Sequence, residues 1–75
     1  MDHLKELIDS GIKDINMHVD DIFYKDHVLN VVLDSSEVID VERIVLATKI
    51  INPIVDKEDI IKDSYTLDVY SKESK

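Results

Sequence analysis

The sequence predicts a small α+β domain with the element order α-β-β-α-β, in which two helices pack on one face of a three-stranded sheet. Three observations support this fold class. Apolar residues follow helical spacing in the stretch that begins at Asp40, and residues 65–70 alternate between apolar and polar side chains. Two more alternating runs lie between residues 12 and 33, separated by a short turn. A chain of 75 residues has room for one domain with a small core; we assign residues 1–70 to it and residues 71–75 to a polar tail.

A short first helix is expected from His3 to Ser10. Asp2 suits the N-cap position, because its side chain can accept a hydrogen bond from an unpaired backbone amide of the first turn. One apolar face is predicted by i, i+3, i+4 spacing, and its members are Leu4, Leu7 and Ile8. Gly11 is the only glycine, and we expect it to end the helix in the left-handed conformation.

From Ile12 the apolar period changes to two, which predicts a strand with one face on the core. Its inward side chains are expected to be Ile15, Met17 and Val19. Asp20-Asp21 interrupts this pattern, and Lys25-Asp26 is typical of a turn. A second strand is expected from His27 to Leu33, and its inward side chains are Leu29, Val31 and Leu33. The short connection favours an antiparallel hairpin.

The main helix is expected to start after Asp40 as N-cap, with Ile39 and Ile44 at the spacing of a hydrophobic staple. The side chains predicted to face the sheet are Ile44, Ala47, Ile51 and Val55, with Val41 and Thr48 beside them. Pro53 lacks a backbone N–H and crowds the preceding turn. We therefore predict a kink or a break near Asn52, followed by one more turn to Asp56.

After a loop through Lys62-Asp63, the third strand is expected from Tyr65 to Tyr70. The helical and alternating patterns together predict a shared core of Leu29, Val31, Ile44, Ile51, Leu67 and Val69. The opposite sheet face is expected to carry His18, Val28, Asn30, Val32, Asp68 and Tyr70. This mixed face suits either an ordinary solvated surface or a docking surface. The strand order is left open.

The composition restricts the classes of partner. Seventeen acidic residues against nine basic ones give a net charge of −8. Phosphate binding usually needs a basic stripe, and none is visible, so a basic protein is favoured over bare RNA or DNA. Solubility alone would explain the charge equally well. There is no cysteine for a disulfide or a thiolate metal site. We expect a cytoplasmic location, since no apolar run is long enough to span a bilayer and no signal peptide opens the chain.

Side chains that could perform catalysis are scattered. His18 and His27, with Asp20 or Asp26, could approach across the hairpin to hold a metal, but no spacing signature supports such a site. Asp20 and Asp21 are neighbours on a strand, so their carboxylates point to opposite faces and cannot share a proton well. A single glycine allows no Gly-rich phosphate loop. We therefore expect no enzymatic activity, no metal and no cofactor.

Several segments resemble the N-terminal domain of the ribosome maturation factor RimP family. They are Gly11 before the first strand, VLNVVLD at Val28–Asp34, Ile39-Asp40, NPIVDKED at Asn52–Asp59 and YTLDV at Tyr65–Val69. In this family, a serine-proline-glycine hinge and a second, Sm-like β-barrel domain usually follow the tyrosine strand. Here the sequence after Tyr70 reads SKESK, which lacks the serine-proline-glycine motif of the hinge. The expectation is a truncated or a divergent stand-alone version of the domain.

The resemblance implies a non-enzymatic assembly factor that binds the immature small ribosomal subunit and helps to place a basic ribosomal protein near the decoding region. We expect a monomer with weak or no direct RNA binding and no membrane association. The candidate partner-binding residues are Asp20, Asp21, Asp68 and Tyr70. Two alternatives remain open, namely a KH-like domain that binds RNA directly and a dimerisation or scaffold domain. A KH-like domain would need a GXXG loop and a positive groove, and the sequence has neither.

Overall fold

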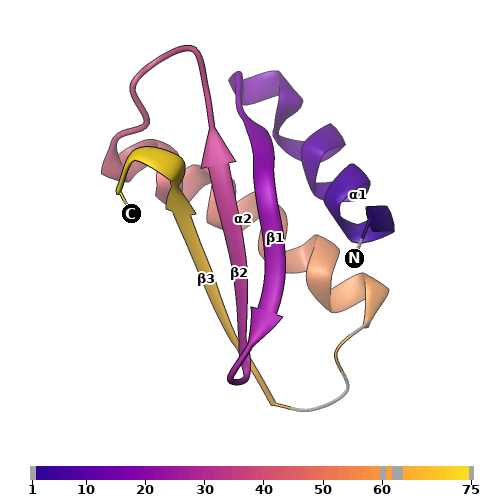
Figure 1. The fold of residues 1–75 in the computed structure, drawn as a ribbon. Coiled ribbons are helices and arrows are strands. Elements are labelled where there is room, and N and C mark those ends of the chain that lie inside the picture. Colours follow the sequence, from indigo (N-terminus) through magenta and orange to yellow (C-terminus); the bar gives the residue numbers. More distant parts are fainter. Residues whose placement is uncertain (1, 60, 62–63, 75) are drawn as a thin grey trace.

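The computed structural model describes residues 2–59, 61 and 64–74, and its elements follow the predicted order (Figure 1). The elements are helix α1 (Asp2–Ile12), 3-10 helix η1 (Lys13–Ile15), strands β1 (His18–Lys25) and β2 (Val28–Asp34), helix α2 (Val41–Glu58), strand β3 (Thr66–Ser71) and 3-10 helix η2 (Lys72–Ser74). The predicted α+β fold is thus confirmed. The loop expected through Lys62-Asp63 lies outside the described residues.

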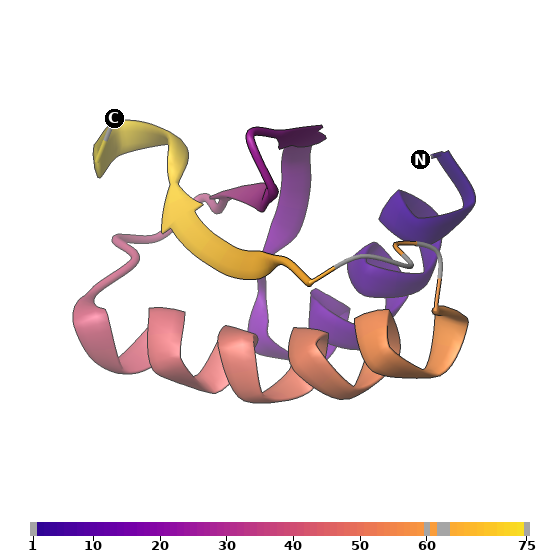
Figure 2. The same ribbon diagram turned by 90° about the horizontal axis from the view of Figure 1, so that it is seen from below.

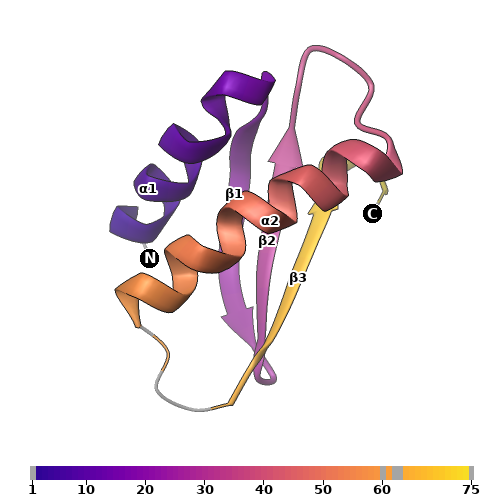
Figure 3. The same cartoon turned by 180° about the vertical axis from the view of Figure 1, so that it is seen from behind.

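The sheet has the order β1-β2-β3, which the sequence left open. β1 and β2 form the predicted antiparallel hairpin, whereas β3 runs parallel to β2, with Leu29 opposite Leu67 and Val31 opposite Val69. A parallel pair needs a crossover connection, and α2 provides it. Figures 2 and 3 show α2 lying across the sheet, with α1 on the same side. Within the described residues, the other side of the sheet carries no α-helix.

The core lies between the two helices and the inner face of the sheet. Its buried members are Leu4, Ile8, Ile12, Met17, Val19, Ile22, Leu29, Val31, Leu33, Ala47, Ile51 and Val55. Of the six residues predicted to be buried together, Leu29, Val31 and Ile51 are fully buried. The other three pack against the same cluster but are only half-buried, and they are Ile44, Leu67 and Val69. The difference follows from position, because β3 is an edge strand and Ile44 lies in the first turn of α2.

Helix α1 begins at Asp2 and continues to Ile12, so Asp2 is its first residue rather than its cap. The expected end at Gly11 is wrong: Gly11 is helical, and no glycine has a positive φ. A close approach between helices explains this glycine. A Cβ built at Gly11 would lie 2.9 Å from Ile54 Cδ1 and 3.2 Å from Ile50 Cγ2. The small residue therefore lets α1 pack tightly against α2.

Replacing Gly11 by alanine should change the free energy of unfolding by no more than about 1 kcal/mol. Alanine gains about 1 kcal/mol in helix propensity. That gain offsets the crowding, since Ile54 Cδ1 is the end of a side chain that can move aside. Gly11→Leu is the contrasting variant, and its larger side chain should cost about 1–3 kcal/mol by forcing the helices apart. Urea denaturation followed by circular dichroism measures both, and an alanine cost as large as the leucine cost would contradict this account.

The chain between α1 and β1 forms a tight reversal rather than the strand expected from Ile12. Residues 13–15 form η1, and Asn16 ends it in the left-handed conformation with φ 58°. Asn16 N donates to Lys13 O at 3.1 Å, and Met17 N donates to Ile12 O at 3.3 Å. Asparagine tolerates this conformation better than most residues. Asn16 thus has the left-handed role that the sequence assigned to Gly11, while Met17 and Val19 are buried as expected.

Asp20-Asp21 does not end β1. The register shifts between Val19 and Asp21, so Asp20 lies in a β-bulge and the strand continues to Lys25. After the bulge, Ile22 returns to the inner face and is buried. Asp26 and His27 form the turn with φ of 52° and 62°. Two successive left-handed residues are typical of a type I′ hairpin turn. The turn lies one residue later than the predicted Lys25-Asp26, so His27 belongs to the turn and β2 begins at Val28 rather than at His27.

The start of α2 agrees with the sequence. Asp40 is the N-cap, and its Oδ1 accepts a hydrogen bond from Arg43 N at 2.9 Å. Ile39 and Ile44 are both half-buried against the core, as a hydrophobic staple requires. Ala47, Ile51 and Val55 are buried, but Val41 is 78% exposed, so its place beside the core stripe was wrongly predicted.

Pro53 does not end α2. The helix continues through it to Glu58, and Asp59 caps the carboxyl end in the left-handed conformation with φ 49°. Of the predicted kink or break near Asn52, the break is therefore wrong, since Figure 2 shows one continuous coil, and the kink stays a prediction. Pro53 lies on the exposed side of the helix, as does Lys49. Water can therefore hydrate the Lys49 carbonyl that proline leaves unpaired, while the burial of Val55 holds the following turn on the core.

Candidate protein-binding surface

The candidate surface is the outer sheet face, the face of the sheet opposite α1 and α2. Cross-strand pairing places Asp21, Val32 and Tyr70 in one row, and Phe23, Asn30 and Asp68 in the next. Lys25, Val28 and Thr66 form a third row toward the hairpin turn. His18 and Asp34 pair at the opposite end. All six residues predicted for this face therefore lie on it, because strand side chains alternate between faces.

Three of the four predicted partner-binding residues come together on this face. Asp21 and Asp68 are exposed and come from the two edge strands, β1 and β3. Asp21 Oδ1 accepts a hydrogen bond from Ile22 N at 2.8 Å, which fixes the carboxylate beside the bulge. The Tyr70 hydroxyl donates to Asn30 Oδ1 at 3.4 Å, so the phenol ring is held over the centre of the face. The two carboxylates thus flank a tyrosine and an amide.

The fourth residue, Asp20, lies in the bulge and is partly neutralised. Its Oδ1 is 3.6 Å from Lys72 Nζ, which reaches it from η2. The Lys72 side chain is 59% exposed and the Asp20 side chain 33%, so solvent screens this ion pair and it contributes little to stability. The sequence pattern assigned Lys72 to a tail, and nothing local could have indicated a contact with a residue so distant along the chain. Asp20 is therefore a weaker candidate than Asp21 or Asp68.

Val32 lies on the outer sheet face but is only 2% exposed, so it is not part of the accessible surface that the alternation predicted. It pairs with Asp21 on one side and Tyr70 on the other. Helix η2 also contacts β2. Figure 2 shows η2 turning toward the outer side of the sheet. The apolar part of this face is thus partly covered by the chain itself, and the accessible part is mainly polar and acidic.

The histidines considered as metal ligands lie apart. His18 starts β1 and His27 lies in the turn at the other end of the hairpin. His18 Nε2 is 3.7 Å from Asp34 Oδ2, and His27 Nδ1 is 3.3 Å from the Tyr24 hydroxyl. The described residues contain no group of three or more His, Cys, Asp or Glu side chains placed to hold a metal ion.

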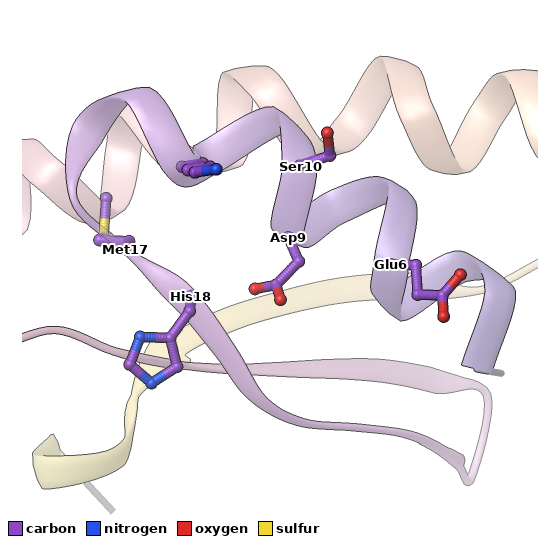
Figure 4. Close-up of a pocket in the computed structure, with 6 residues that line it drawn as sticks. Glu6, Asp9, Ser10, Met17 and His18 are labelled. Atoms are coloured by element: carbon purple, nitrogen blue, oxygen red, sulfur yellow. The ribbon is translucent and has the colours of Figure 1, made fainter.

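A shallow pocket beside β1 has a structural explanation. Its volume is about 330 Å³, and it is lined by Glu6, Asp9, Ser10, Lys13, Met17 and His18 (Figure 4). Asp9 points toward β1, where its Oδ1 accepts a hydrogen bond from Val19 N at 2.6 Å. This bond satisfies a backbone amide next to the bulge and ties α1 to β1. The pocket thus marks the junction of these elements.

Tyr65 lies outside the outer sheet face, and the pKa of its phenol is shifted. Burial raises the pKa of the Tyr65 phenol above its usual value, and the carboxylates of Asp56 and Asp59 raise this pKa further. The phenol therefore stays neutral at physiological pH and adds no charge near the end of α2. The accessible charge on the outer sheet face comes instead from aspartates, with Lys25 and Lys72 as the lysines.

The family model described as the RimP N-terminal domain matches residues 7–72. The chain belongs to this family. The match covers both helices and all three strands, from within α1 to the start of η2. It confirms the family suggested by the sequence motifs and identifies the chain as a RimP-type domain of the ribosome maturation factors. Among curated proteins, none matches the chain.

Two structural facts accompany the RimP assignment. β3 includes Ser71, which is buried, and η2 follows it. The division into a domain of residues 1–70 and a polar tail stays a prediction. In the described part of the chain, no helix is both long enough and apolar enough to cross a bilayer.

Proposed function

We propose that this RimP-type domain is a non-enzymatic, cytoplasmic module that binds the immature small ribosomal subunit through a basic ribosomal protein. The observation that carries the proposal is the outer sheet face, where Asp21 and Asp68 are exposed on either side of Tyr70. No α-helix of the described part of the chain covers them. Separated carboxylates on a rigid sheet can steer a cationic partner and fix its orientation. Asp20 joins this set as a peripheral contact.

The acidity of the face also bears on the RNA-binding alternative. The exposed carboxylates on and beside it would repel phosphates, and direct RNA binding relies on cationic contacts. The net charge of the whole chain, −8, acts in the same direction. An acidic domain of this kind contacts the ribosomal RNA indirectly, through a basic protein whose charge offsets that of the domain. The domain itself is proposed to act as a monomer.

Replacing Asp21 and Asp68 together by asparagine should weaken binding to the basic ribosomal protein about fivefold at low salt. Each exposed charge contact contributes up to about 1 kcal/mol, and asparagine keeps an oxygen for the Ile22 amide. The measurement is a titration of the labelled chain against isolated small-subunit ribosomal proteins, one at a time. Small-subunit RNA is titrated in parallel, and each titration is repeated at moderate salt, where the affinity should fall.

The matched control replaces Glu6 by glutamine and Asp14 by asparagine, which removes the same charge from α1 and η1. This control should change the affinity less than twofold, a limit of about 0.4 kcal/mol. An equal loss in both variants would mean that only net charge matters. Tight RNA binding without protein binding would overturn the proposal in favour of direct RNA recognition. Self-association without either partner, measured by sedimentation, would favour a dimerisation domain.

A further inference from the structure

The second feature of interest is a set of exposed valines at the amino end of α2, here called the valine patch: Val38, Val41 and Val45. Their side chains are 79%, 78% and 47% exposed. The described residues include five exposed large hydrophobic side chains, and three of the five form this patch. Single exposed apolar residues are ordinary. Their concentration at one end of one helix is what requires an explanation.

The fold itself does not need these valines. Val41 and Val45 are separated by four residues, so they are neighbours on one side of α2. That side is turned away from the core, where Ala47 and Ile51 are buried. A β-branched residue also lowers helix stability relative to alanine at an exposed position. Neither burial nor helix propensity therefore accounts for valine at these two positions.

The loop that carries Val38 is held in place by its hydrogen bonds. Arg43 Nη1 donates to Val38 O at 3.4 Å and to Glu37 Oε2 at 3.1 Å, and Arg43 Nη2 donates to Ile15 O. Ser35 Oγ donates to Asn16 O at 2.6 Å and accepts from Glu37 N at 3.1 Å. Ile39 packs inward against the core. The exposed Val38 is thus presented by an anchored segment, which reduces the entropy cost of binding.

The charges around the valine patch select its partner. The segment that carries the valine patch, residues 37–49, contains three carboxylates, Glu37, Asp40 and Glu42, and two cations, Arg43 and Lys49. Lys49 lies one turn after Val45, whereas the carboxylates lie at the amino end of the patch. Arg43 is committed to the loop contacts, with its side chain only 22% exposed. A second copy of this chain would bring the same acidic rim against itself, and anionic lipids or nucleic acids would be repelled in the same way. A protein segment with both cationic and apolar side chains complements the patch in both respects.

We propose that the valine patch is a docking site for a cationic amphipathic segment of a partner protein, separate from the outer sheet face. The valines contact the apolar side of that segment, and Glu37, Asp40 and Glu42 face its lysines or arginines. The proposal deepens the proposed function, because it gives a basic partner a second contact on the opposite side of the sheet. It also predicts that binding there depends on apolar contact as well as charge.

The test uses the triple variant Val38→Thr/Val41→Thr/Val45→Thr, which keeps the side-chain shape and the β-branch and replaces one methyl group of each valine by a hydroxyl. The control is Leu46→Gln, since Leu46 is 45% exposed on the same helix. Leu46 lies about 100° around the helix from Val45 and so points away from the patch. Thermal unfolding should show both variants within about 0.5 kcal/mol of the parent chain, as expected for exposed positions.

The first probe is a synthetic peptide of leucine and lysine at helical spacing, compared with an oligolysine peptide of equal length and charge. In chemical-shift mapping, the leucine–lysine peptide should move the amide signals of Val38, Val41 and Val45. The triple variant should bind this peptide about tenfold more weakly than the parent chain. The Leu46→Gln control should bind like the parent. Equal shifts with oligolysine, or no loss of affinity in the triple variant, would overturn the proposal.

The second probe is the ribosomal protein that binds in the titration above. If it binds the parent chain and the triple variant equally, the proposed function stands and the valine patch is not its docking site. If no ribosomal protein binds but the leucine–lysine peptide docks on the patch, the docking site stands and the ribosomal assignment fails. A loss of ribosomal-protein affinity in the triple variant alone, with Leu46→Gln unchanged, would support both.

Discussion

Replacing Ile51 by alanine should lower the free energy of unfolding by about 2–5 kcal/mol, because it removes three carbons from a fully buried site and leaves a cavity. Ile51 lies in the centre of α2 and belongs to the cluster that contains Leu29 and Val31. A domain of 75 residues has a total stability of about 4–11 kcal/mol. If the loss is at the upper end of this range and the total stability is at the lower end, much of the variant would be unfolded at room temperature. Urea denaturation followed by circular dichroism gives the value.

Ile44→Ala is the matched control, since it makes the same chemical change about two turns earlier in α2. Ile44 is only half-buried, so its truncation removes less buried apolar surface than that of Ile51 and should cost about 1–2 kcal/mol. The sequence pattern placed Ile44 in the same core as Ile51. Equal losses at Ile44 and Ile51 would show that α2 is rotated relative to the sheet from the position described.

Replacing Arg43 by methionine should lower the free energy of unfolding by about 1–3 kcal/mol, because the Ile15 carbonyl loses a charged donor. Methionine keeps an apolar stem, so the change isolates the guanidinium. The same substitution removes the bonds to Val38 O and Glu37 Oε2. The amide signals of residues 35–38 should therefore broaden or move in nuclear magnetic resonance spectra, while urea denaturation measures the stability loss.

Two control variants separate the contacts of Arg43. Glu37→Gln removes only the ion pair with an exposed carboxylate, which should cost less than about 0.5 kcal/mol. Arg43→Lys keeps the charge but cannot reach several acceptors with one planar group, so its loss should approach that of methionine. A Glu37→Gln loss equal to the Arg43→Met loss would assign the stability to the ion pair rather than to the Ile15 carbonyl.

Local patterns predicted what depends on local geometry. Alternation in β2 identified the inward set Leu29, Val31 and Leu33, since each strand residue points opposite to its neighbour. The N-cap Asp40 was also predictable, because its partner Arg43 N is only three residues away. The same alternation placed Asp68 and Tyr70 on one face of the sheet. These features need no knowledge of the tertiary fold.

The errors arose where tertiary contacts outweighed local preference. Gly11 serves the packing of α1 on α2 rather than a helix end, and only the positions of Ile50 and Ile54 reveal this. Pro53 is tolerated because its side of α2 faces solvent while Val55 is buried. The pairing of Lys72 with Asp20 and of Arg43 with Ile15 likewise joins residues far apart in sequence. Sequence spacing carries no signal for such contacts.

The parallel pairing of β2 with β3 determines the order in which the chain can acquire structure. The β1–β2 hairpin closes through a two-residue turn, so its contacts are local and can form early. The β2–β3 pairing joins Val28 to Thr66, and all of α2 lies between these residues in the sequence. Closing so long a segment carries a larger entropy cost than closing the hairpin. During synthesis, one edge of β2, the strand that carries Leu29, Val31 and Leu33, therefore stays unpaired until β3 has left the ribosome. A factor for ribosome assembly would thus complete its own sheet last, at the strand that carries Asp68 and Tyr70.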